Sequence, residues 1–315
     1  MSAVRRLLDR WLVAQQPLTG LAAPLRPETL PAGTLLGQIR IERLIARGAS
    51  AVLYAGVDEA ADTAVAVKLL CPPQSGSDPR ASDEACTRFL QDAEQASRLR
   101  HPGIVRVFGG GRVRGLAFVV MELLPGVDLT RYTQASRLLP EALALDIAAQ
   151  LAEALAYAHR EGMVHRDVKP ANVMFDPATH SVKLTDFGLA RSVDAEATRS
   201  GVLLGSPAYM APELLGGARA DARSDLYALG VLLFELLTGR LPFEGDSMGA
   251  LLRAMATQAP NTVQALRPDL PGAQAAALDA VLAPVRARAA LERLGDGDAW
   301  ARVIRRASPS EPSVI

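Results

Sequence analysis

The change of residue pattern near Leu129 constrains the fold of this chain most strongly. Before it, short runs rich in β-branched residues and separated by turn residues predict strands: IRIERLIA, AVLYAGV, TAVAVKLL, IVRVFGGG and LAFVVMEL. One long helical pattern, DEACTRFLQDAEQASRLR, interrupts them, and helical patterns such as LALDIAAQLAEALAYAHREG follow. We therefore predict an α+β fold, with a small strand-rich part before a larger helical part and a ligand cleft between them.

Length, charge and cysteine content narrow the class of protein. The 315 residues suffice for one large domain or two modest ones. The 34 basic and 34 acidic residues cancel, so nothing favours nucleic acid or an anionic membrane as the main partner. Cys71 and Cys86 stand alone and are predicted to be reduced thiols. No apolar run reaches the ~18 residues of a transmembrane span, and no signal peptide is recognisable. We therefore expect a soluble, cytoplasmic protein.

The two ends of the chain differ from its middle. Residues 1–34 predict an N-terminal amphipathic helix followed by a Pro-rich linker. The helix, residues 1–16, either packs on its own protein, mediates partner docking or dimerisation, or binds a membrane surface. Residues 306–315 predict a disordered tail, in which Ser308 is a weak candidate for a basic-directed phosphorylation site.

The segment VHRDVKPANVMF, residues 164–175, carries most of the chemical information. Asp167, Lys169 and Asn172 lie within six positions, so they can place a base, a phosphate-binding charge and a metal ligand around one transferring group. Fourteen residues past Asn172 comes the sequence DFG, and further on GSPAYMAPE. A solvated loop residue is a reasonable interpretation of any one of these residues alone, but it does not account for the ordered set.

These segments resemble the protein kinase family, and more narrowly the bacterial serine/threonine kinases that share the eukaryotic kinase fold. The resemblance covers roughly residues 36–305. It implies a bilobal kinase domain at 35–305, with an N-lobe of about 35–122 and a C-lobe of about 123–305. It also implies transfer of the γ-phosphate of ATP to Ser or Thr hydroxyls of protein substrates, with Mg²⁺ or Mn²⁺, and autophosphorylation of the activation loop.

The resemblance assigns roles to the motif residues. Asp167 is expected to accept the proton of the substrate hydroxyl, and Lys169 to balance charge on the transferring group. Asn172 and Asp186 supply the hard oxygen ligands that Mg²⁺ prefers. Lys68, at the end of AVAVKLL, matches the lysine that holds the α and β phosphates.

The same resemblance outlines a nucleotide site. Met121 would be the gatekeeper, the backbone of Glu122 and Leu124 would read the purine edge, and Asp128 would lie near the ribose. The phosphate-covering loop is poor in glycine. Where GxGxxG is usual it reads Ala46-x-Gly48-x-x-Ala51, which predicts a stiffer but usable cover. The remaining expected nucleotide contacts are Leu53, Ala66 and Met174.

A second departure concerns the helix before HPGIV. Counting back from His101, Asp92 occupies the place of the glutamate that pairs with the strand lysine. Its carboxylate falls short by about 1.5 Å, one C–C bond. Glu94 cannot replace it, because two positions turn a helix by about 200°. Either the helix lies closer to Lys68 or a water bridges the pair, and the predicted effect is a lower rate with nucleotide binding retained.

The activation segment and its anchors complete the expectations. Arg166 implies a loop ordered by phosphate, with Thr198 and Ser200 as the favoured sites, against the alternative of a loop ordered without phosphate. Ser206 is expected to contact Asp167 and Lys169.

Two further residues are expected to act as scaffolding. Glu213 is expected to pair with Arg293. Asp225 is expected to cap the turn that holds the catalytic loop.

Three function classes remain open at this point. An active serine/threonine kinase is favoured by the complete set of Asp167, Asn172 and Asp186. A pseudokinase or very slow kinase that acts as a nucleotide-binding scaffold is the alternative suggested by Asp92 and the glycine-poor loop. A small-molecule phosphotransferase is disfavoured by GSPAYMAPE, because such enzymes lack this platform for a peptide substrate.

Overall fold

The computed structural model describes residues 26–48, 50–71, 79–187, 207–215, 217–282 and 296–307. These residues divide into two compact units, in line with the predicted two-part fold. The first unit comprises 26–100 and 105–124, and the second comprises 101–104 and the described residues from 125 onward. The predicted lobe boundary at 122/123 therefore moves by two residues, and the loop 101–104 belongs with the helical unit rather than with the N-lobe.

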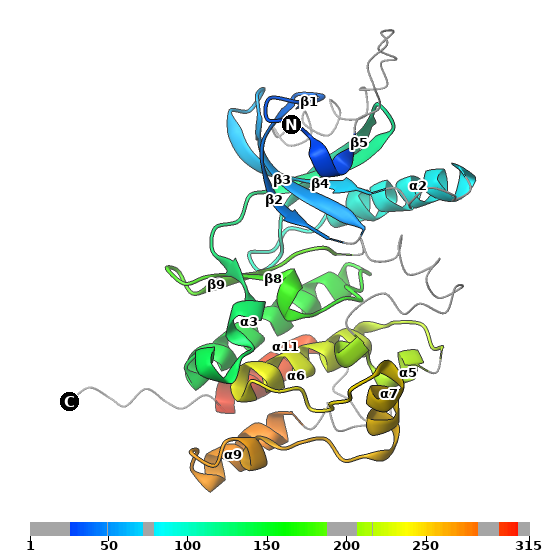
Figure 1. Cartoon of the computed structure of the whole chain (residues 1–315). Helices are drawn as coiled ribbons and strands as arrows, with labels where there is room; N and C mark the ends of the chain where they lie inside the picture. The colour runs from blue at the N-terminus through cyan, green and yellow to red at the C-terminus, as the bar shows by residue number, and fades with distance from the viewer. Residues whose placement is uncertain are drawn as a thin grey trace, which may run out of the picture. The chain divides into compact units, whose positions relative to one another are not determined.

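An antiparallel sheet of six strands forms most of the first unit (Figure 1). Across the sheet the strands are β1 (Leu35–Leu36), β2 (Ile39–Arg47), β3 (Ala51–Asp58), β4 (Thr63–Leu70), β6 (Leu116–Glu122) and β5 (Val107–Val113). The five predicted strand runs are confirmed, because β-branched and apolar residues pack well on a pleated surface. The short β1 was not predicted as a separate strand.

The sheet has two faces with different roles. Tyr54, Val65, Val67 and Leu69 belong to the hydrophobic core and are at most 2% exposed. Because neighbouring residues of a strand point to opposite faces, Lys68 and the residues in register with it belong to the other face. The core therefore fixes which face carries the predicted nucleotide contacts.

Helix α2 (Pro79–Ala96) packs against β5 and β6. Figure 1 labels α2 and β5. The helical pattern predicted for residues 83–100 is confirmed, although the helix begins at Pro79 and ends at Ala96. Its buried residues recur at helical spacing; they are Ala85, Cys86, Phe89, Asp92, Ala93 and Ala96. Gly110 of β5 allows a close approach. A Cβ there would lie 2.6 Å from Phe118 O and 3.1 Å from Leu90 Cδ2.

Part of the predicted linker is folded, which corrects the expectation for residues 26–34. A short 3₁₀ helix, η1 (Pro27–Thr29), is held by the buried Tyr54 side chain. The Tyr54 hydroxyl donates to Pro27 O at 2.9 Å and accepts from Leu30 N at 3.1 Å. Leu30 joins the core. The helix predicted for residues 1–16 lies outside the described residues.

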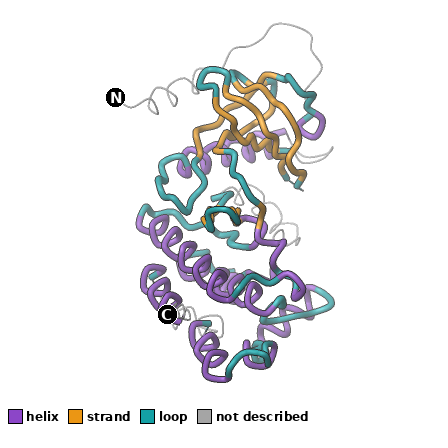
Figure 2. The backbone as a smooth tube through the Cα atoms, turned by 90° about the vertical axis from the view of Figure 1, so that its left-hand side faces the viewer, coloured by secondary structure: helices purple, strands orange, loops and turns teal. Residues whose placement is uncertain are grey.

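The second unit is mainly helical, as the tube in Figure 2 shows. Its α-helices are α3 (Glu141–Arg160), α5 (Pro212–Leu215), α6 (Ala222–Thr238), α7 (Met248–Thr257), α8 (Val263–Leu266), α9 (Gly272–Val281) and α11 (Gly297–Ala307). Its strands β7 (Val127–Asp128), β8 (Val173–Asp176) and β9 (Ser181–Leu184) form a small antiparallel sheet. The described part of this unit also contains four 3₁₀ helices: η2 (Leu129–Tyr132), η3 (Ala135–Arg137), η4 (Pro170–Asn172) and η5 (Pro207–Tyr209).

Helix α6 is the buried centre of this unit. Nearly every residue of it is buried, so its apolar sequence SDLYALGVLLFELLT forms a core helix. Asp221 begins the helix with a capping box shared with Ser224. Gly239 ends it at φ 71°, where a Cβ would lie 2.6 Å from Ala135 N. These caps fix both ends of α6.

Helix α11 packs along α3, and this contact corrects the predicted tail. A Cβ on Gly297 would lie 2.6 Å from Ala152 O, so the two helices approach closely. Arg305 pairs with Glu153 at 2.9 Å and with Asp146 at 3.2 Å. The helix continues through Ala307, so residues 306–307 are helical, whereas 308–315, including Ser308, lie outside the described residues. None of the helices in the described part of the chain has the length and apolar character that a bilayer span requires.

The loop between α2 and β5 is held by the second unit, which explains its place there. Gly103 O accepts a hydrogen bond from Leu184 N at 2.9 Å. The His101 ring stacks on Tyr157 of α3, with centroids 5.2 Å apart, and His101 Nδ1 accepts from Gly103 N at 3.0 Å. Burial lowers the pKa of this imidazole.

Candidate active site

The loop between α3 and β8 brings Asp167, Lys169 and Asn172 together, as their spacing predicted. Lys169 Nζ lies 2.7 Å from Asp167 Oδ2 and 2.9 Å from Oδ1. Asn172 Nδ2 donates to the backbone oxygen of Asp167 and to its Oδ2, both at 2.8 Å. Asn172 is buried, whereas the Asp167 side chain keeps 25% exposure. One carboxylate is thus oriented by an ammonium and an amide and remains accessible.

The buried side chain of His165 contacts the backbone of this loop. Its Nε2 lies 2.8 Å from the backbone oxygen of Thr185, and its Nδ1 lies 3.2 Å from Asp167 N. A carbonyl accepts and a backbone N–H donates, so the ring carries its proton on Nε2 and accepts at Nδ1. The Phe187 ring packs edge-on against it at 4.5 Å. Because His165 is fully buried, it couples the backbone of Asp167 to the segment that precedes Asp186.

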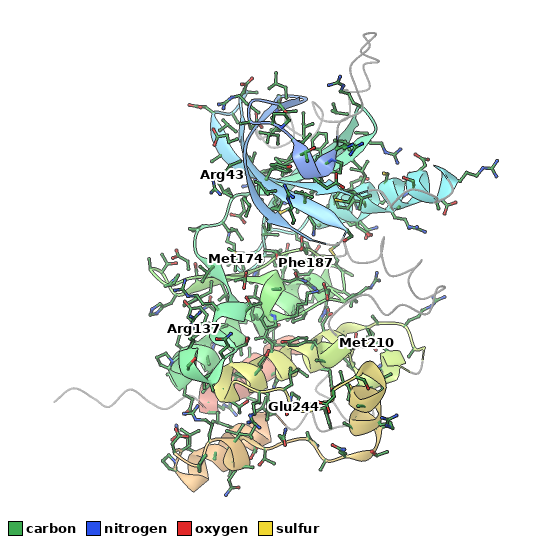
Figure 3. The ribbon with its side chains drawn as sticks, viewed as in Figure 1. Arg43, Arg137, Met174, Phe187, Met210 and Glu244 are labelled. Carbon is green, nitrogen blue, oxygen red and sulfur yellow. The ribbon has the colours of Figure 1, made fainter. Side chains whose placement is uncertain are left out.

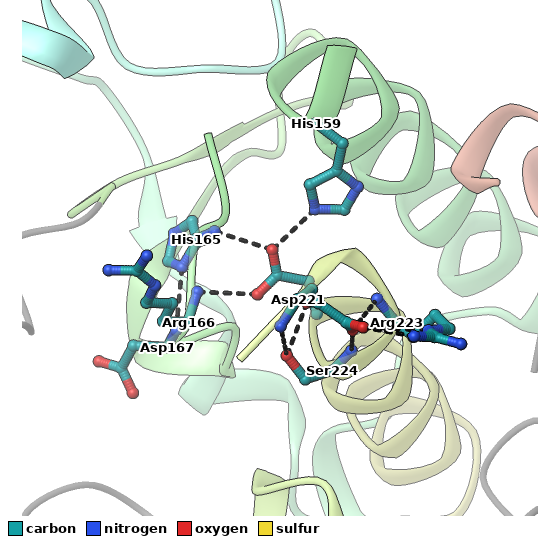
Figure 4. A network of polar contacts seen from close by, with 8 residues as sticks. His159, His165, Arg166, Asp167, Asp221, Arg223 and Ser224 are labelled. Atoms are coloured by element: carbon teal, nitrogen blue, oxygen red, sulfur yellow. Dashed lines mark hydrogen bonds and ion pairs between the residues drawn. The ribbon is translucent and has the colours of Figure 1, made fainter. Parts of the chain in front are cut away.

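Asp225 of α6 holds the start of the same loop, which confirms the predicted cap (Figure 4). Its Oδ2 accepts from His165 N at 2.8 Å, and its Oδ1 accepts from Arg166 N at 2.7 Å. His159 Nε2 of α3 lies 2.8 Å from the same Oδ2. The side chain of Asp225 is 1% exposed. A buried carboxylate with three donors is a strong anchor, because each charge-assisted bond is stronger than a neutral one.

Arg166 and Asp186 both adopt left-handed backbone conformations. Their φ values are 73° and 65°, in a region that costs a non-glycine residue about 1–3 kcal/mol. Hydrogen bonds of the backbone at or next to each residue hold these conformations. Arg166 N is held by Asp225, and Thr185 N, next to Asp186, donates to Asn172 O at 2.9 Å. Strain of this kind clusters at functional sites.

Sheet register collects the predicted nucleotide contacts of the first unit on one face. Lys68 lies opposite Leu53 on one side and Val119 on the other. Ala66 lies opposite Met121 and two residues before Lys68, so it shares that face. On the neighbouring strand β2, Ala46 is the register partner of Leu53. Met121 is buried, and its gatekeeper role stays a prediction.

The strands on either side of the glycine-poor loop remain paired close to it. Arg47 pairs with Val52, and Gly48 N donates to Ala51 O at 2.8 Å. This bond occupies the amide of Gly48. Residue 49 lies outside the described residues, so the stiffness of the loop and its use as a phosphate cover stay predictions.

Asp92 is buried, and its helix lies on the face of the sheet that carries Lys68. A Cβ on Gly110 would lie 3.3 Å from Val119 Cγ2 and 3.1 Å from Leu90 Cδ2. Leu90 of α2 therefore approaches Val119, which is the register partner of Lys68. Asp92 is 6% exposed. The alternative acid, Glu94, is 70% exposed and pairs with Arg98 at 3.3 Å, so it faces away as expected.

The residues expected near adenine and ribose lie at the ends of both units. Glu122 N donates to Arg106 O at 2.9 Å, and Arg106 N donates to Glu122 Oε1 at 2.6 Å, which fixes the end of β6. Asp128 caps η2 by accepting from Thr130 N at 2.9 Å. Met174 of β8, labelled in Figure 3, pairs with Asp128. Leu124 is half-buried at the end of the first unit.

The activation segment falls largely outside the described residues. The undescribed residues include Thr198, Ser200 and Ser206 of this segment, and also Arg293, the expected partner of Glu213. The predicted roles of these four residues therefore stay predictions. From Pro207 onward the chain is described, and Tyr209 donates a hydrogen bond to Glu235 of α6. Burial raises the pKa of both groups.

Two structural residues escaped prediction from sequence. His159 and Thr185 contribute to the network around the catalytic loop through contacts at sequence separations of 66 and 20 residues. No local spacing signals a partner so far along the chain. Only the position of His159 at the end of an amphipathic helix, facing the core, could have drawn notice.

Comparison with known proteins agrees with this geometry. The model of the family described as protein kinase domain matches residues 39–279. The serine/threonine-protein kinase PknA of Mycobacterium tuberculosis is 41% identical over 244 residues, which are 76% of this chain and 54% of PknA. The serine/threonine-protein kinase PrkC of Bacillus subtilis is 39% identical over 212 residues, 67% of this chain and 32% of PrkC. The chain thus spans between a third and about half of these curated relatives.

A solved structure supports the fold. The crystal structure of Rad53 1-466 in complex with AMP-PNP superimposes with a TM-score of 0.68 at 23% identity. The match covers 85% of this chain and 65% of that one. The matched residues include strands β2 to β6 and the loop of Asp167. The chain belongs to the protein kinase family and is related to the bacterial serine/threonine kinases.

Proposed function

We propose that this chain is a serine/threonine protein kinase that transfers the γ-phosphate of ATP to Ser or Thr hydroxyls of proteins. The observation that carries the proposal is the arrangement of Asp167. Lys169 and Asn172 orient its carboxylate at 2.7–2.9 Å, and it remains partly exposed. A general base must combine a fixed direction with access to the substrate hydroxyl. The names of PknA and PrkC support the same activity.

The proposed roles of Asp167 and Lys169 follow from what phosphoryl transfer requires. Asp167 accepts the proton of the attacking hydroxyl and orients its oxygen. Lys169, whose Nζ already lies beside that carboxylate, balances charge on the transferring group. Little covalent chemistry is required of the protein, so positioning and charge supply most of the rate enhancement.

Nucleotide binding is assigned to the sheet face with Lys68, Leu53, Ala66 and Met121. Small and apolar side chains beside a lysine suit a purine with its phosphates. The AMP-PNP named in the Rad53 structure supports ATP as the nucleotide. We further propose that Asp92 pairs with Lys68, since α2 lies on that face of the sheet.

The residues of the second unit fit a magnesium ion. Asn172 uses its amide nitrogen on Asp167, which leaves its carbonyl oxygen as the ligand, and Asp186 supplies a carboxylate. The described residues contain no group of three or more His, Cys, Asp or Glu that would form a complete cage. Mg²⁺ in such sites takes one or two protein oxygens, with substrate phosphates and water for the rest. When bound, the ion neutralises phosphate charge, and Mn²⁺ suits the same donors.

Regulation is proposed through the activation segment. Arg166 stands next to Asp167, where it can receive a phosphate carried on Thr198 or Ser200. The bound phosphate would order the segment by charge-assisted hydrogen bonds. Residues 1–16 are proposed as a docking or dimerisation element.

The decisive test uses γ-labelled ATP, Mg²⁺ and a generic basic protein, with the Asp167→Ala variant alongside. We expect label on the wild-type chain or on the basic protein, and a loss of about 10²–10⁴-fold with the variant. Binding of a fluorescent ATP analogue should be nearly unchanged in the variant. Wild-type protein that is folded and binds nucleotide but transfers no label would instead identify a nucleotide-binding scaffold.

A further inference from the structure

Arg112 of β5 connects the sheet to the first turns of α2. Its guanidinium donates to the Asp83 carboxylate, to Asp83 O at 3.1 Å and to Thr87 Oγ1 at 2.9 Å. The Thr87 hydroxyl in turn donates to Asp83 O at 2.8 Å. A planar guanidinium with three acceptors fixes direction as well as distance. The Arg112 side chain is 37% exposed, so this contact lies at the edge of the sheet.

These contacts lie on one flank of α2. Asp83, Thr87 and Leu90 recur at i, i+4 and i+7, and Leu90 approaches Gly110 of β5 as Arg112 approaches the other two. Asp92 is nine residues beyond Asp83, about 900° along the helix, and so faces the opposite flank. In the sheet, β5 is the edge strand, and β4 with Lys68 lies beyond β6. The flank of α2 with Asp83 and Leu90 therefore faces β5, and Asp92 lies on the flank turned away from β5, while the helix as a whole packs against β5 and β6.

We propose that Arg112 is a positioning residue that sets the rotation of α2, so that the short Asp92 carboxylate reaches Lys68. This inference rests on the proposed function. A glutamate at this place could absorb a small rotation of the helix by changing its rotamer. Asp92 is about 1.5 Å shorter and has one fewer rotatable bond, so the helix itself must be placed more closely.

Two further ion pairs at α2 do not have this effect. Glu84 pairs with Arg88 at 3.9 Å within the helix, and Glu94 pairs at 3.3 Å with Arg98, which lies in the turn just after the helix. Neither pair fixes the helix against the sheet. Arg98 is therefore a suitable control, because it is an arginine paired with a residue of α2 and 74% of its side chain is exposed.

The experiment compares Arg112→Ala and Arg98→Ala in the full chain, each with and without Asp92→Glu. Two quantities are measured: kcat and KM for ATP with a basic protein substrate, and hydrogen–deuterium exchange of residues 79–96. We expect Arg112→Ala to lower kcat about tenfold, since small misplacements of reacting groups cost this much or more. In the Asp92→Glu background the same change should cost less than about threefold, because the longer side chain tolerates rotation. Arg98→Ala should cost less than twofold in both backgrounds.

Three outcomes would overturn the inference. Arg112→Ala could leave kcat within twofold of the wild type. Its loss could be the same in both backgrounds, which would indicate a general effect on folding. Its α2 amides could exchange no faster than those of Arg98→Ala. The exchange measurement does not depend on activity. A wild-type chain that transfers no phosphate would refute the proposed function, but hydrogen–deuterium exchange would still show whether Arg112 fixes α2 against the sheet.

Discussion

Asp225 Oδ1 accepts a hydrogen bond from the backbone nitrogen of Arg166 at 2.7 Å, across 59 positions of sequence. This bond holds Arg166 in a left-handed conformation, φ 73°, immediately before the proposed base Asp167. The same carboxylate accepts from His165 N at 2.8 Å. A helix buried at the centre of the second unit thus fixes the backbone of the catalytic loop.

Asp225→Asn tests this anchor. Asn retains one acceptor oxygen but turns an amide toward a backbone N–H, so at least one buried bond is lost. We expect the free energy of unfolding to fall by about 1.5–3 kcal/mol, measured by urea denaturation. Asp269→Asn, at an exposed aspartate, should change it by less than about 0.5 kcal/mol. Equal losses in the two variants would refute a special role for Asp225.

Asp92→Glu tests the pairing with Lys68. If Asp92 occupies the place of the helix glutamate, the longer side chain should give equal or higher kcat in the labelled-ATP assay. Glu94→Asp, at an exposed position of the same helix, is the matched control and should leave kcat within about twofold. A collapse of activity in Asp92→Glu would mean that the helix has adjusted to the shorter side chain.

Asp186→Asn tests the metal site. The substitution keeps the size of the side chain and removes its charge, so we expect the Mg²⁺ concentration for half-maximal activity to rise about tenfold or more. Asp176→Asn, at the last residue of β8, should leave it unchanged. An unaltered Mg²⁺ requirement in Asp186→Asn would exclude this carboxylate as a ligand. Removal of the metal ion with EDTA should stop phosphate transfer by the wild type.

The stability of the loop 101–104 should depend on pH through His101. Burial lowers the pKa of this imidazole, and Arg160 also lowers it, against Glu153 and Asp298, which raise it. A depressed folded pKa favours the neutral ring, so its contribution is present above the unfolded value of about 6.5 and is lost as pH falls below it. At low pH the protonated ring can no longer accept the bond from Gly103 N.

The check on this pH dependence is urea unfolding at pH 7.5 and 5.5. We expect the wild type to lose more stability between these values than His101→Asn, whose amide oxygen accepts a hydrogen bond at both. His180→Asn, at an exposed turn, should behave as the wild type does. Parallel losses in the wild type and His101→Asn would contradict the assignment.

Local chemistry explains why much of the candidate site could be predicted. Strands β2 to β6 and helix α2 follow from runs whose periodicity reports a buried face. Asp167, Lys169 and Asn172 lie within six positions on one loop, so their meeting requires little more than a turn. The departures at Asp92, Ala46 and Ala51 were also visible, since they are differences of residue type within recognised segments.

Contacts between distant segments could not be predicted in the same way. Residues 26–34 were predicted to be a linker because they belong to a short stretch, residues 17–33, that contains four prolines. Nothing in the sequence indicates that Leu30 is buried and that its backbone N–H donates to the hydroxyl of Tyr54. The loop 101–104 joins the second unit because Gly103 O meets Leu184 N, 81 positions away. The Arg112 contact with Asp83 spans 29 positions.

The sequence by itself determined the family, the strand and helix pattern and the identity of the groups that perform the proposed chemistry. Only the tertiary structure decided the further contacts that hold them: His159 on Asp225, the tautomer of His165, and Arg112 on the flank of α2. The physical reason is range. Residue type and spacing report interactions within a few positions, whereas these anchors form only when packing brings separate segments within hydrogen-bonding distance.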